Sequence, residues 1–256
     1  METILEIDSV AKSFGGLTAL VDVSFSVGQG QIKSVIGPNG AGKTTLYNVV
    51  TGVDAVSEGA IRFFGERIDG LKPHMITKKG IARTFQNIEL FENMSVIENV
   101  MLGRHARTTT GVLAGAFKFP GGRREEQDIY RRSLELLEFV GLHERVEEES
   151  SGLPFGLQRY LEIARALATD PKLLLLDEPA SGLDSGESQT LADLILRIRD
   201  TGITVLLVEH NMDVAMEISD EIVVLNYGMK IAEGTPREIQ NDPAVITAYL
   251  GDEGYA

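Results

Sequence analysis

The stretch GPNGAGKT, residues 37–44, restricts the fold of this chain more than any other, because it fits the spacing G-x-x-x-x-G-K-[ST]. It follows the apolar run QIKSVIG and precedes TTLYNVV, so we expect a strand, a glycine-rich turn and a helix in that order. Such a turn directs backbone N–H groups at a phosphate, and the helix N-terminus adds its dipole. A glycine-rich turn without a ligand is the alternative, and the strand before and the helix after it favour the phosphate site.

Each polar residue of this stretch has an expected role toward a nucleoside triphosphate. Lys43 is expected to reach the β- and γ-phosphates, Thr44 to ligate Mg²⁺ and Thr45 to hydrogen-bond the α-phosphate. The sequence therefore predicts ATP and Mg²⁺ as ligands. The predicted nucleotide-binding residues of the loop are Gly37, Pro38, Asn39, Gly40, Ala41, Gly42, Lys43, Thr44 and Thr45.

A second stretch, LLLLDEP at residues 173–179, reads as a buried strand that ends in two acids. Carboxylates at the carboxyl end of a strand lie where ligands bind in open α/β sheets. We expect Asp177 to hold Mg²⁺ and Glu178 to polarise the attacking water as a general base. A strand that ends in acids is by itself more often structural. The presence of the phosphate loop in the same chain favours a catalytic role for these two acids.

Three further residues are candidates for the nucleotide site because of their order along the chain. Gln86 in RTFQN and His210 in VEHN each follow a predicted strand. Gln86 is predicted to ligate Mg²⁺ and sense the γ-phosphate, and His210 to bind the γ-phosphate and orient the water near Glu178. Phe14 stands beside a Gly-Gly turn, where it either stacks on adenine or serves as a core phenylalanine.

The pattern of elements predicts an α/β domain with a helical insertion. Strands dominate residues 1–87, and continuous apolar strands alternate with helices in 150–256, which is typical of a parallel sheet covered on both faces. Residues 88–149 show helical periodicity and are predicted to form a mostly helical subdomain. Within it, TTTGVLAGAFKFPGG (108–122) reads as a loop or lid. The end, NDPAVITAYLGDEGYA, reads as a helix and a tail.

Composition excludes several classes. The 256-residue chain has a formal net charge of −14, which argues against nucleic acid as a partner. It has no cysteine, so disulfides, thiolate metal sites and a cysteine nucleophile are excluded. The start METILEIDSV does not read as a signal peptide, and no run approaches the ~18 apolar residues of a membrane span. These features favour a cytoplasmic chain whose membrane contact goes through a partner.

The motifs GPNGAGKTT, RTFQ, LPFGLQRYLEIARAL, LLLLDEP, SGLD and VEH occur in this order, and together they resemble the ATP-binding subunit of an ABC transporter. The resemblance covers essentially the whole chain. It implies an α/β P-loop NTPase fold of the ABC ATPase type, with a RecA-like core, an antiparallel β part and a helical subdomain. It also implies ATP hydrolysis by a head-to-tail dimer that encloses two ATP molecules, in which Asp184 makes a cross-dimer contact.

The stretches SFGGLTAL, RTFQNIELFENMSVIENVMLGRHAR, EHNMDVAMEISDEIVVLNYGMKIAEGTP and DPAVITAYLG, with the insertion after Arg107, are similar to the ATPases of branched-chain amino-acid importers. That resemblance implies three partners: membrane-spanning permease subunits, a second ATPase subunit and, indirectly, an extracytoplasmic substrate-binding protein. It places the chain at the cytoplasmic face of the membrane as a peripheral subunit. We expect the region 95–106 to pass motion to the permease.

Other functions stay open at this point. ATPases for the import of urea or other amides and amino acids, and for lipopolysaccharide export, look similar. A soluble ABC ATPase acting on DNA or the ribosome usually carries two cassettes or long insertions, and this chain has one cassette. A P-loop kinase would need an acceptor pocket in place of SGLD and LPFGLQ.

LPFGLQ, residues 153–158, aligns with the ABC signature LSGGQ and departs from it at three places. Pro154 replaces the serine and has neither a side-chain donor nor an N–H. Phe155 replaces a glycine and Leu157 a glutamine, while Gly156 remains as the predicted phosphate contact. In one interpretation the N–H groups at the helix end suffice. In the other, this loop forms a weak half-site, and turnover depends on a paralogous partner ATPase.

Overall fold

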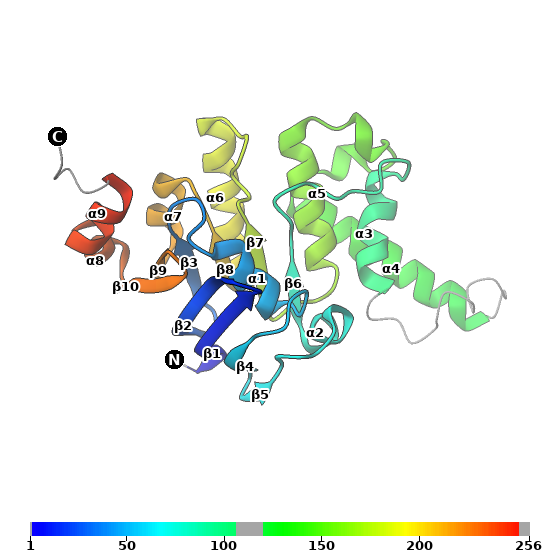
Figure 1. Ribbon diagram of the computed structural model, residues 1–256. Helices are drawn as coiled ribbons and strands as arrows, with labels where there is room; N and C mark the ends of the chain where they lie inside the picture. Colours follow the sequence, from blue (N-terminus) through cyan, green and yellow to red (C-terminus); the bar gives the residue numbers. More distant parts are fainter. Residues whose placement is uncertain (1, 106–119, 251–256) are drawn as a thin grey trace. The chain divides into compact units, whose positions relative to one another are not determined.

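The computed structural model describes residues 2–105 and 120–250 of the chain (Figure 1). The chain forms two compact units, one made of residues 1–76 and 172–256 and the other of residues 77–171. The second unit thus extends beyond the range 88–149 of the predicted helical subdomain at both ends. The chain enters and leaves it once, so the first unit is assembled from both ends of the sequence.

An antiparallel sheet in the first unit takes up the predicted early strands. Its strands are β1 (Thr3–Phe14), β2 (Leu17–Gly28), β4 (Glu58–Phe63) and β5 (Glu66–Arg67), in the order β2-β1-β4-β5. The turn Gly15–Gly16 joins β1 to β2, and Phe14 pairs with Leu17 across it. Apolar side chains such as Ile4, Val23 and Phe63 are buried, in keeping with the alternation of apolar and polar residues.

A second sheet carries the buried apolar strands of the first unit. It contains β3 (Ile32–Ile36), β7 (Leu173–Asp177), β8 (Thr204–Val208), β9 (Glu221–Asn226) and β10 (Met229–Gly234), in the order β10-β9-β3-β8-β7. β3 is parallel to both β8 and β9, β7 is parallel to β8, and β10 is antiparallel to β9. Every residue of β3, β7 and β8 is buried. Because parallel strands end at one edge, the residues after β3, β7 and β8 are candidates for one site.

Helices connect these strands as the sequence predicts. The first unit contains α1 (Lys43–Val50), α6 (Ser185–Asp200), α7 (Met212–Ile218), α8 (Pro236–Gln240) and α9 (Pro243–Leu250), and α2 (Pro73–Lys79) spans its boundary. α1 is fixed by Tyr47, whose hydroxyl donates to the carbonyl oxygens of Leu206 at 2.5 Å and Leu176 at 3.3 Å. The helix that begins at the phosphate loop is therefore bonded to both β7 and β8.

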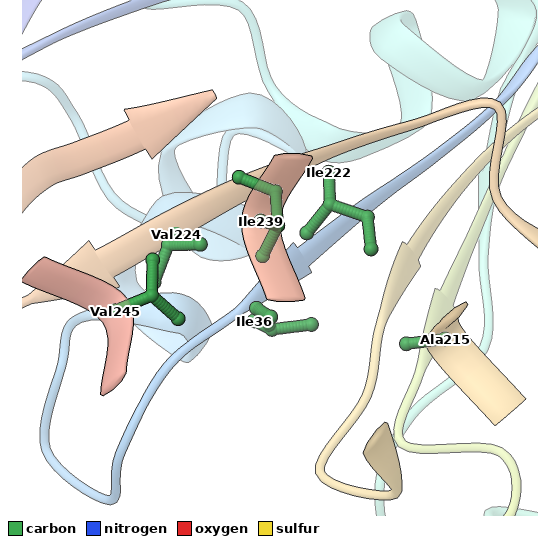
Figure 2. Close-up of a cluster of buried hydrophobic side chains, with 6 residues drawn as sticks. All are labelled: Ile36, Ala215, Ile222, Val224, Ile239 and Val245. Carbon is green, nitrogen blue, oxygen red and sulfur yellow. The ribbon is translucent and has the colours of Figure 1, made fainter. Parts of the chain in front are cut away.

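The two C-terminal helices pack onto the end of β3. Val245 of α9 and Ile239 of α8 are buried with Ile36 of β3 and Val224 of β9 in one apolar cluster, which Figure 2 shows. Ile36 directly precedes the phosphate loop. The predicted C-terminal helix thus has a packing partner next to that loop.

The second unit is mostly helical. It contains β6 (Ile81–Arg83), α3 (Val96–His105), α4 (Pro120–Phe139), the 3-10 turns η1 (His143–Arg145) and η2 (Ser150–Gly152), and α5 (Phe155–Leu167). α3 packs against both α4 and α5, and this packing explains why α5 joins the unit. Residues 108–119 of the predicted loop lie outside the described residues, and its last three residues, 120–122, begin α4 instead.

The signature-like stretch differs from its expected form. The sequence suggested a loop before a helix, whereas α5 already begins at Phe155 with Pro154 as the N-cap residue. Proline at this position has no side chain that caps the helix, and Gln158 instead donates from its side chain to the carbonyl of Leu153 at 3.0 Å. LPFGLQ is therefore largely the first turn of α5.

No helix in the described ranges 2–105 and 120–250 is long and apolar enough to cross a membrane.

Candidate functional site

The predicted phosphate loop connects β3 to α1 and is held in a conformation that only glycine tolerates at two places. Gly42 is the N-cap residue of α1 with φ at 103°, and a Cβ there would lie 2.7 Å from the carbonyl oxygen of Ala19. Gly37, at the end of β3, stands so close to the carbonyl of Leu225 that a side chain would collide with it. Gly37 and Gly42 are therefore needed for space as well as for backbone freedom.

Lys43 lies inside this loop rather than in solvent. Its side chain is buried, and its ammonium group donates to the carbonyl oxygens of Gly37 at 2.6 Å and Pro38 at 3.1 Å. Burial lowers the pKa of the Lys43 ammonium, and the carboxylates of Glu178 and Asp177 act on it in the opposite direction. The loop thus directs a cation at its own concave side, and two acids from the end of β7 are close enough to act on that cation.

Asp177 and Glu178 lie where β7 ends. Asp177 is buried as the last residue of the strand, and the N–H of Glu178 donates to the carbonyl of Val208 on β8 at 2.8 Å. Glu178 has φ at 47°, a left-handed conformation that is uncommon for a residue with a side chain. Such strained positions persist only where the surroundings enforce them, and they gather at functional sites.

Glu209 is a functional candidate that motif reasoning missed. It is buried and accepts hydrogen bonds from the N–H groups of Ala180, His210 and Asn211 at 2.8, 3.0 and 3.1 Å. It therefore ties the segment after β8, which carries His210, to the segment after Glu178. Burial is the main cause that raises the pKa of the Glu209 carboxyl. An acid directly after the apolar strand TVLLV was the available signal.

His210, Phe14 and Asp184 lie at the surface of the first unit. His210 is exposed at the start of the segment after β8. Phe14 is 46% exposed, so its ring is not part of the core, and the Lys12 ammonium lies 4.5 Å from the ring centroid. Asp184 caps α6 by accepting from the N–H of Glu187 at 2.8 Å, while the Glu187 carboxylate accepts from the N–H of Asp184.

Gln86 and Gly156 belong to the second unit. Gln86 is exposed in the segment after β6, and Gly156 is half-buried in the first turn of α5. The first unit brings together the phosphate loop, Asp177 and Glu178, and it holds His210 through Glu209. Gln86 and Gly156 are described within their own unit.

The residues at the loop fit a magnesium–nucleotide complex. Within the described parts of the chain, no group of three or more His, Cys, Asp or Glu side chains forms a metal cage. Mg²⁺ in phosphate-loop sites needs none, because one or two carboxylates and substrate phosphates supply its ligands together with water. Thr44, exposed in the first turn of α1, and Asp177, at the end of β7, are the residues with suitable oxygens.

Family models match two parts of the chain. The model described as ABC transporter matches residues 20–181, which is more than half of the chain. A second model, described as branched-chain amino acid ATP-binding cassette transporter, matches residues 229–255. The second match covers β10 and the C-terminal helices that pack beside the phosphate loop.

Individual proteins are similar over nearly the full length. The high-affinity branched-chain amino acid transport ATP-binding protein BraF of Pseudomonas aeruginosa is 46% identical over 250 residues, which cover 97% of this chain and 98% of that protein. The structure of an ATP-binding cassette of an ABC transporter in its ADP conformation shares 33% identity with a TM-score of 0.86 and covers 98% of this chain and 100% of its own. A dimeric cassette in a post-hydrolysis state, bound to ADP and Pi, shares 26% identity with a TM-score of 0.77, covering 91% of this chain and 99% of its own. The predicted P-loop NTPase fold of the ABC type is thereby confirmed, and the chain belongs to the ATP-binding subunits of the ABC transporter family.

Proposed function

We propose that this chain hydrolyses ATP to energise an ABC importer, and that the imported cargo is a branched-chain amino acid. The observation that carries the catalytic part is the buried Lys43 in the phosphate loop, with the carboxylates of Asp177 and Glu178 acting on it from the end of β7. A cation for phosphate and acids for metal and water are the groups that phosphoryl transfer to water needs.

Each site residue takes one role in this proposal. Lys43 and the loop N–H groups hold the β- and γ-phosphates, Thr45 bonds the α-phosphate, and the exposed Phe14 ring stacks on adenine. Glu178 accepts the proton of the attacking water. His210, positioned by Glu209, contacts the γ-phosphate.

Thr44, Asp177 and Gln86 are the proposed holders of Mg²⁺. When bound, the ion neutralises charge on the phosphates. The protein's own contribution is to keep hydroxyl, carboxylate and amide oxygens at the carboxyl ends of the strands. Metal-free protein is therefore expected to retain its fold, because the described residues hold no cluster of acids that needs the ion.

The complete site is proposed to need a second ATPase subunit. Its signature loop would close the site on this P-loop, while Gly156 and the first turn of α5 would close the partner's site. Pro154 and Leu157 weaken that contribution, so a paralogous partner with a better signature gives one strong site at this chain's P-loop. Asp184, which already caps α6, contributes the cross-dimer contact.

Membrane-spanning permease subunits are the proposed partners of the second unit. A hollow of about 400 Å³ there is lined by Leu102 and Gly103 of α3 and by Arg165 of α5. Phe91, 52% exposed, borders it with the Arg165 guanidinium 5.8 Å from its ring centroid. Such a recess with an exposed aromatic supports the binding of a short cytoplasmic segment of the permease, and the proposed location of the chain is the cytoplasmic face of the membrane.

The cargo rests on similarity, since an ATPase need not touch cargo. The chain resembles a high-affinity branched-chain amino acid transport protein over its full length and in its C-terminal helices. An extracytoplasmic binding protein would select the amino acid. The competing functions are the import of urea and the export of lipopolysaccharide.

Two measurements test this function in sequence. The chain purified together with its partner ATPase should release free phosphate from Mg-ATP, and Glu178→Gln in this chain should lower the rate by about 10²- to 10⁴-fold while ATP binding is retained. A phosphorylated small-molecule product in place of free phosphate would instead indicate a kinase. Next, the membrane subunits that co-purify with the chain are reconstituted in vesicles. ATP hydrolysis stimulated by a leucine-loaded binding protein supports the cargo, and stimulation by urea or lipopolysaccharide alone overturns it.

A further inference from the structure

Two charged side chains of α5 form hydrogen bonds with the backbone of Gln86 and of the residue before it. The Arg159 guanidinium donates from Nη1 to the carbonyl of Phe85 at 2.9 Å and from Nη2 to the carbonyl of Gln86 at 3.1 Å. Glu162 accepts from the N–H of Phe85 at 3.0 Å through Oε1. Its other oxygen, Oε2, accepts from Arg159 Nη1 at 3.0 Å. Consecutive backbone groups are thus bonded to one ion pair.

This ion pair is buried to a degree that a surface salt bridge is not. The side chains of Arg159 and Glu162 are only 1% and 2% exposed. A buried ion pair is in general no more stabilising than well-packed apolar residues of the same volume. Its four hydrogen-bonding atoms therefore matter for what they hold, which is the backbone of residues 85 and 86.

Phe155 adds a third member at the surface. Its ring, 49% exposed, lies with its centroid 5.8 Å from the guanidinium carbon of Arg159. Arg159 Nε is buried without a hydrogen-bond partner. The guanidinium is consequently held by its two Nη groups and by the aromatic ring. Phe155 is the residue that replaces a glycine of the signature, so the substitution gives Arg159 a partner.

We propose that Phe155, Arg159 and Glu162 form a positioning clamp that fixes the backbone of Gln86 to the first part of α5. The clamp thereby sets the position of Gln86 relative to Gly156, and these are the two residues of this unit with proposed contacts to nucleotide. None of the three touches the nucleotide in this scheme. The inference rests on the proposed role of Gln86 in hydrolysis. It assigns a use to the unusual aromatic of LPFGLQ.

Hydrogen–deuterium exchange measures the clamp without any ligand. In Arg159→Lys the ammonium keeps its charge but cannot fork to two carbonyls. The peptide that contains residues 84–88 should then exchange at least several-fold faster than in wild type, while peptides of α1 and β7 keep their rates. The matched control is Arg145→Lys, which alters an exposed pair with Glu148 at the same spacing on the same unit and should leave residues 84–88 unchanged. Unchanged exchange in Arg159→Lys overturns the clamp.

The kinetic test separates positioning from general damage. Arg159→Lys should lower kcat for ATP hydrolysis about 10- to 100-fold, as expected for a misplaced group, and the Kd for ATP and the binding stoichiometry should stay within about 2-fold. Gln86→Ala should lower kcat as well, and adding Arg159→Lys to it should cost less than about 2-fold more, because both changes remove the same contact. Fully additive losses in kcat, or a loss of ATP binding, would show that Arg159 and Glu162 form an ordinary structural ion pair that does not position Gln86.

A surface variant covers the case in which Arg159 variants do not fold. Phe155→Leu should raise exchange at residues 84–88 and lower kcat about 2- to 5-fold, the size of a cation–π contact. Wild-type exchange and kcat in Phe155→Leu would overturn the ring's part. If Gln86→Ala keeps the wild-type kcat, the proposed function of Gln86 fails and the inference on hydrolysis falls with it. A loss in Gln86→Ala with additive effects overturns the inference alone.

Discussion

Single residues in this protein position catalytic groups through the backbone. Lys43 donates to carbonyls of its own loop, Tyr47 donates to carbonyls within β7 and β8, and Glu209 accepts from N–H groups of two segments. Each of these side chains is buried and polar, and each bonds backbone atoms of the parallel strands or of the segments that follow them. The position of Glu178 and His210, the proposed catalytic residues, therefore depends on residues that are not proposed to react.

Phe14 offers a test of how ATP is distinguished from bare phosphate. Phe14→Leu keeps an apolar side chain but removes the aromatic face, so the Kd for ATP should rise about 3- to 10-fold. The affinity for inorganic tripolyphosphate, measured by competition, should not change. Phe64→Leu, at an exposed aromatic in the turn between β4 and β5, serves as the matched control. An equal loss for tripolyphosphate would contradict adenine stacking.

Glu209 predicts a pH dependence of stability with a definite sign. Its pKa is raised from 4.5, chiefly by burial, so the folded chain retains a proton at pH values where the unfolded chain has lost it. The stability from this group is full below that ordinary value and is lost as the pH rises through the raised one. The free energy of unfolding of Glu209→Gln should therefore improve relative to wild type as the pH rises above 4.5.

The check is urea unfolding of both proteins across that range. Glu147→Gln, which makes the same substitution at an exposed position, is the matched control. A difference between Glu209→Gln and wild type that stays constant with pH would refute the shifted titration.

At the scale of elements, the C-terminal helices act as a support for the phosphate loop. α9 places Val245 against Ile36, the residue before Gly37, and Tyr249 on the same helix hydrogen-bonds the backbone of Gly37. Burial raises the pKa of that tyrosine to about 12. The last described helix of the chain is thus connected to the first residue of the nucleotide motif.

The packing of α9 can be measured with two adjacent variants. Val245→Ala removes buried carbon from the cluster and should cost about 2 kcal/mol of unfolding free energy, a drop in Tm of roughly 4–8 °C. Ile246→Ala alters a neighbour that is 44% exposed and should change stability by less than about 0.5 kcal/mol. Thermal unfolding of both variants decides this, and equal losses would contradict the one-sided packing of α9.

The sequence patterns predict most elements correctly, but they do not predict the start of α5 or the buried charged residues that position the candidate site. The buried strands and the helices after them follow from apolar runs and glycine punctuation, and β7, β8 and α6 lie where the patterns predicted. The start of α5 lies earlier than predicted. Alignment of LPFGLQ with a glycine-rich signature suggests a loop, whereas Phe155 and Leu157 suit a helix. Glu209, Arg159 and Glu162 were missed for a different reason: each bonds at least one backbone atom that lies far away in the sequence, and no spacing rule encodes such a contact.

At the scale of the whole molecule, the chain is one half of the proposed catalytic assembly. Slowing hydrolysis should accumulate the closed form, so Glu178→Gln with Mg-ATP should double its molar mass in light scattering if LPFGLQ still closes on phosphate. Persistence of the monomer favours a chain that requires a different ATPase or its membrane subunits.

The residue Asp184 refines this measurement. Asp184→Asn keeps a good helix cap but loses the charge, and it should weaken any dimer without unfolding α6. If the double variant with Glu178→Gln dimerises as well as the single one, the cross-dimer role of Asp184 is excluded.

The position of β3 between β8 and β9 has a consequence for synthesis on the ribosome. The phosphate motif leaves the ribosome early, yet both neighbours of β3 come from beyond residue 203, and the N–H of Gly228 bonds the loop carbonyl of Ala41 at 3.0 Å. At ~5–20 residues per second, the stretch between β3 and β8 takes roughly 8 to 34 s to translate. During that time the nascent chain presents an apolar strand without its sheet, which makes it a client for chaperones. An early stop codon accordingly yields a polypeptide that contains the whole nucleotide motif and cannot build the loop.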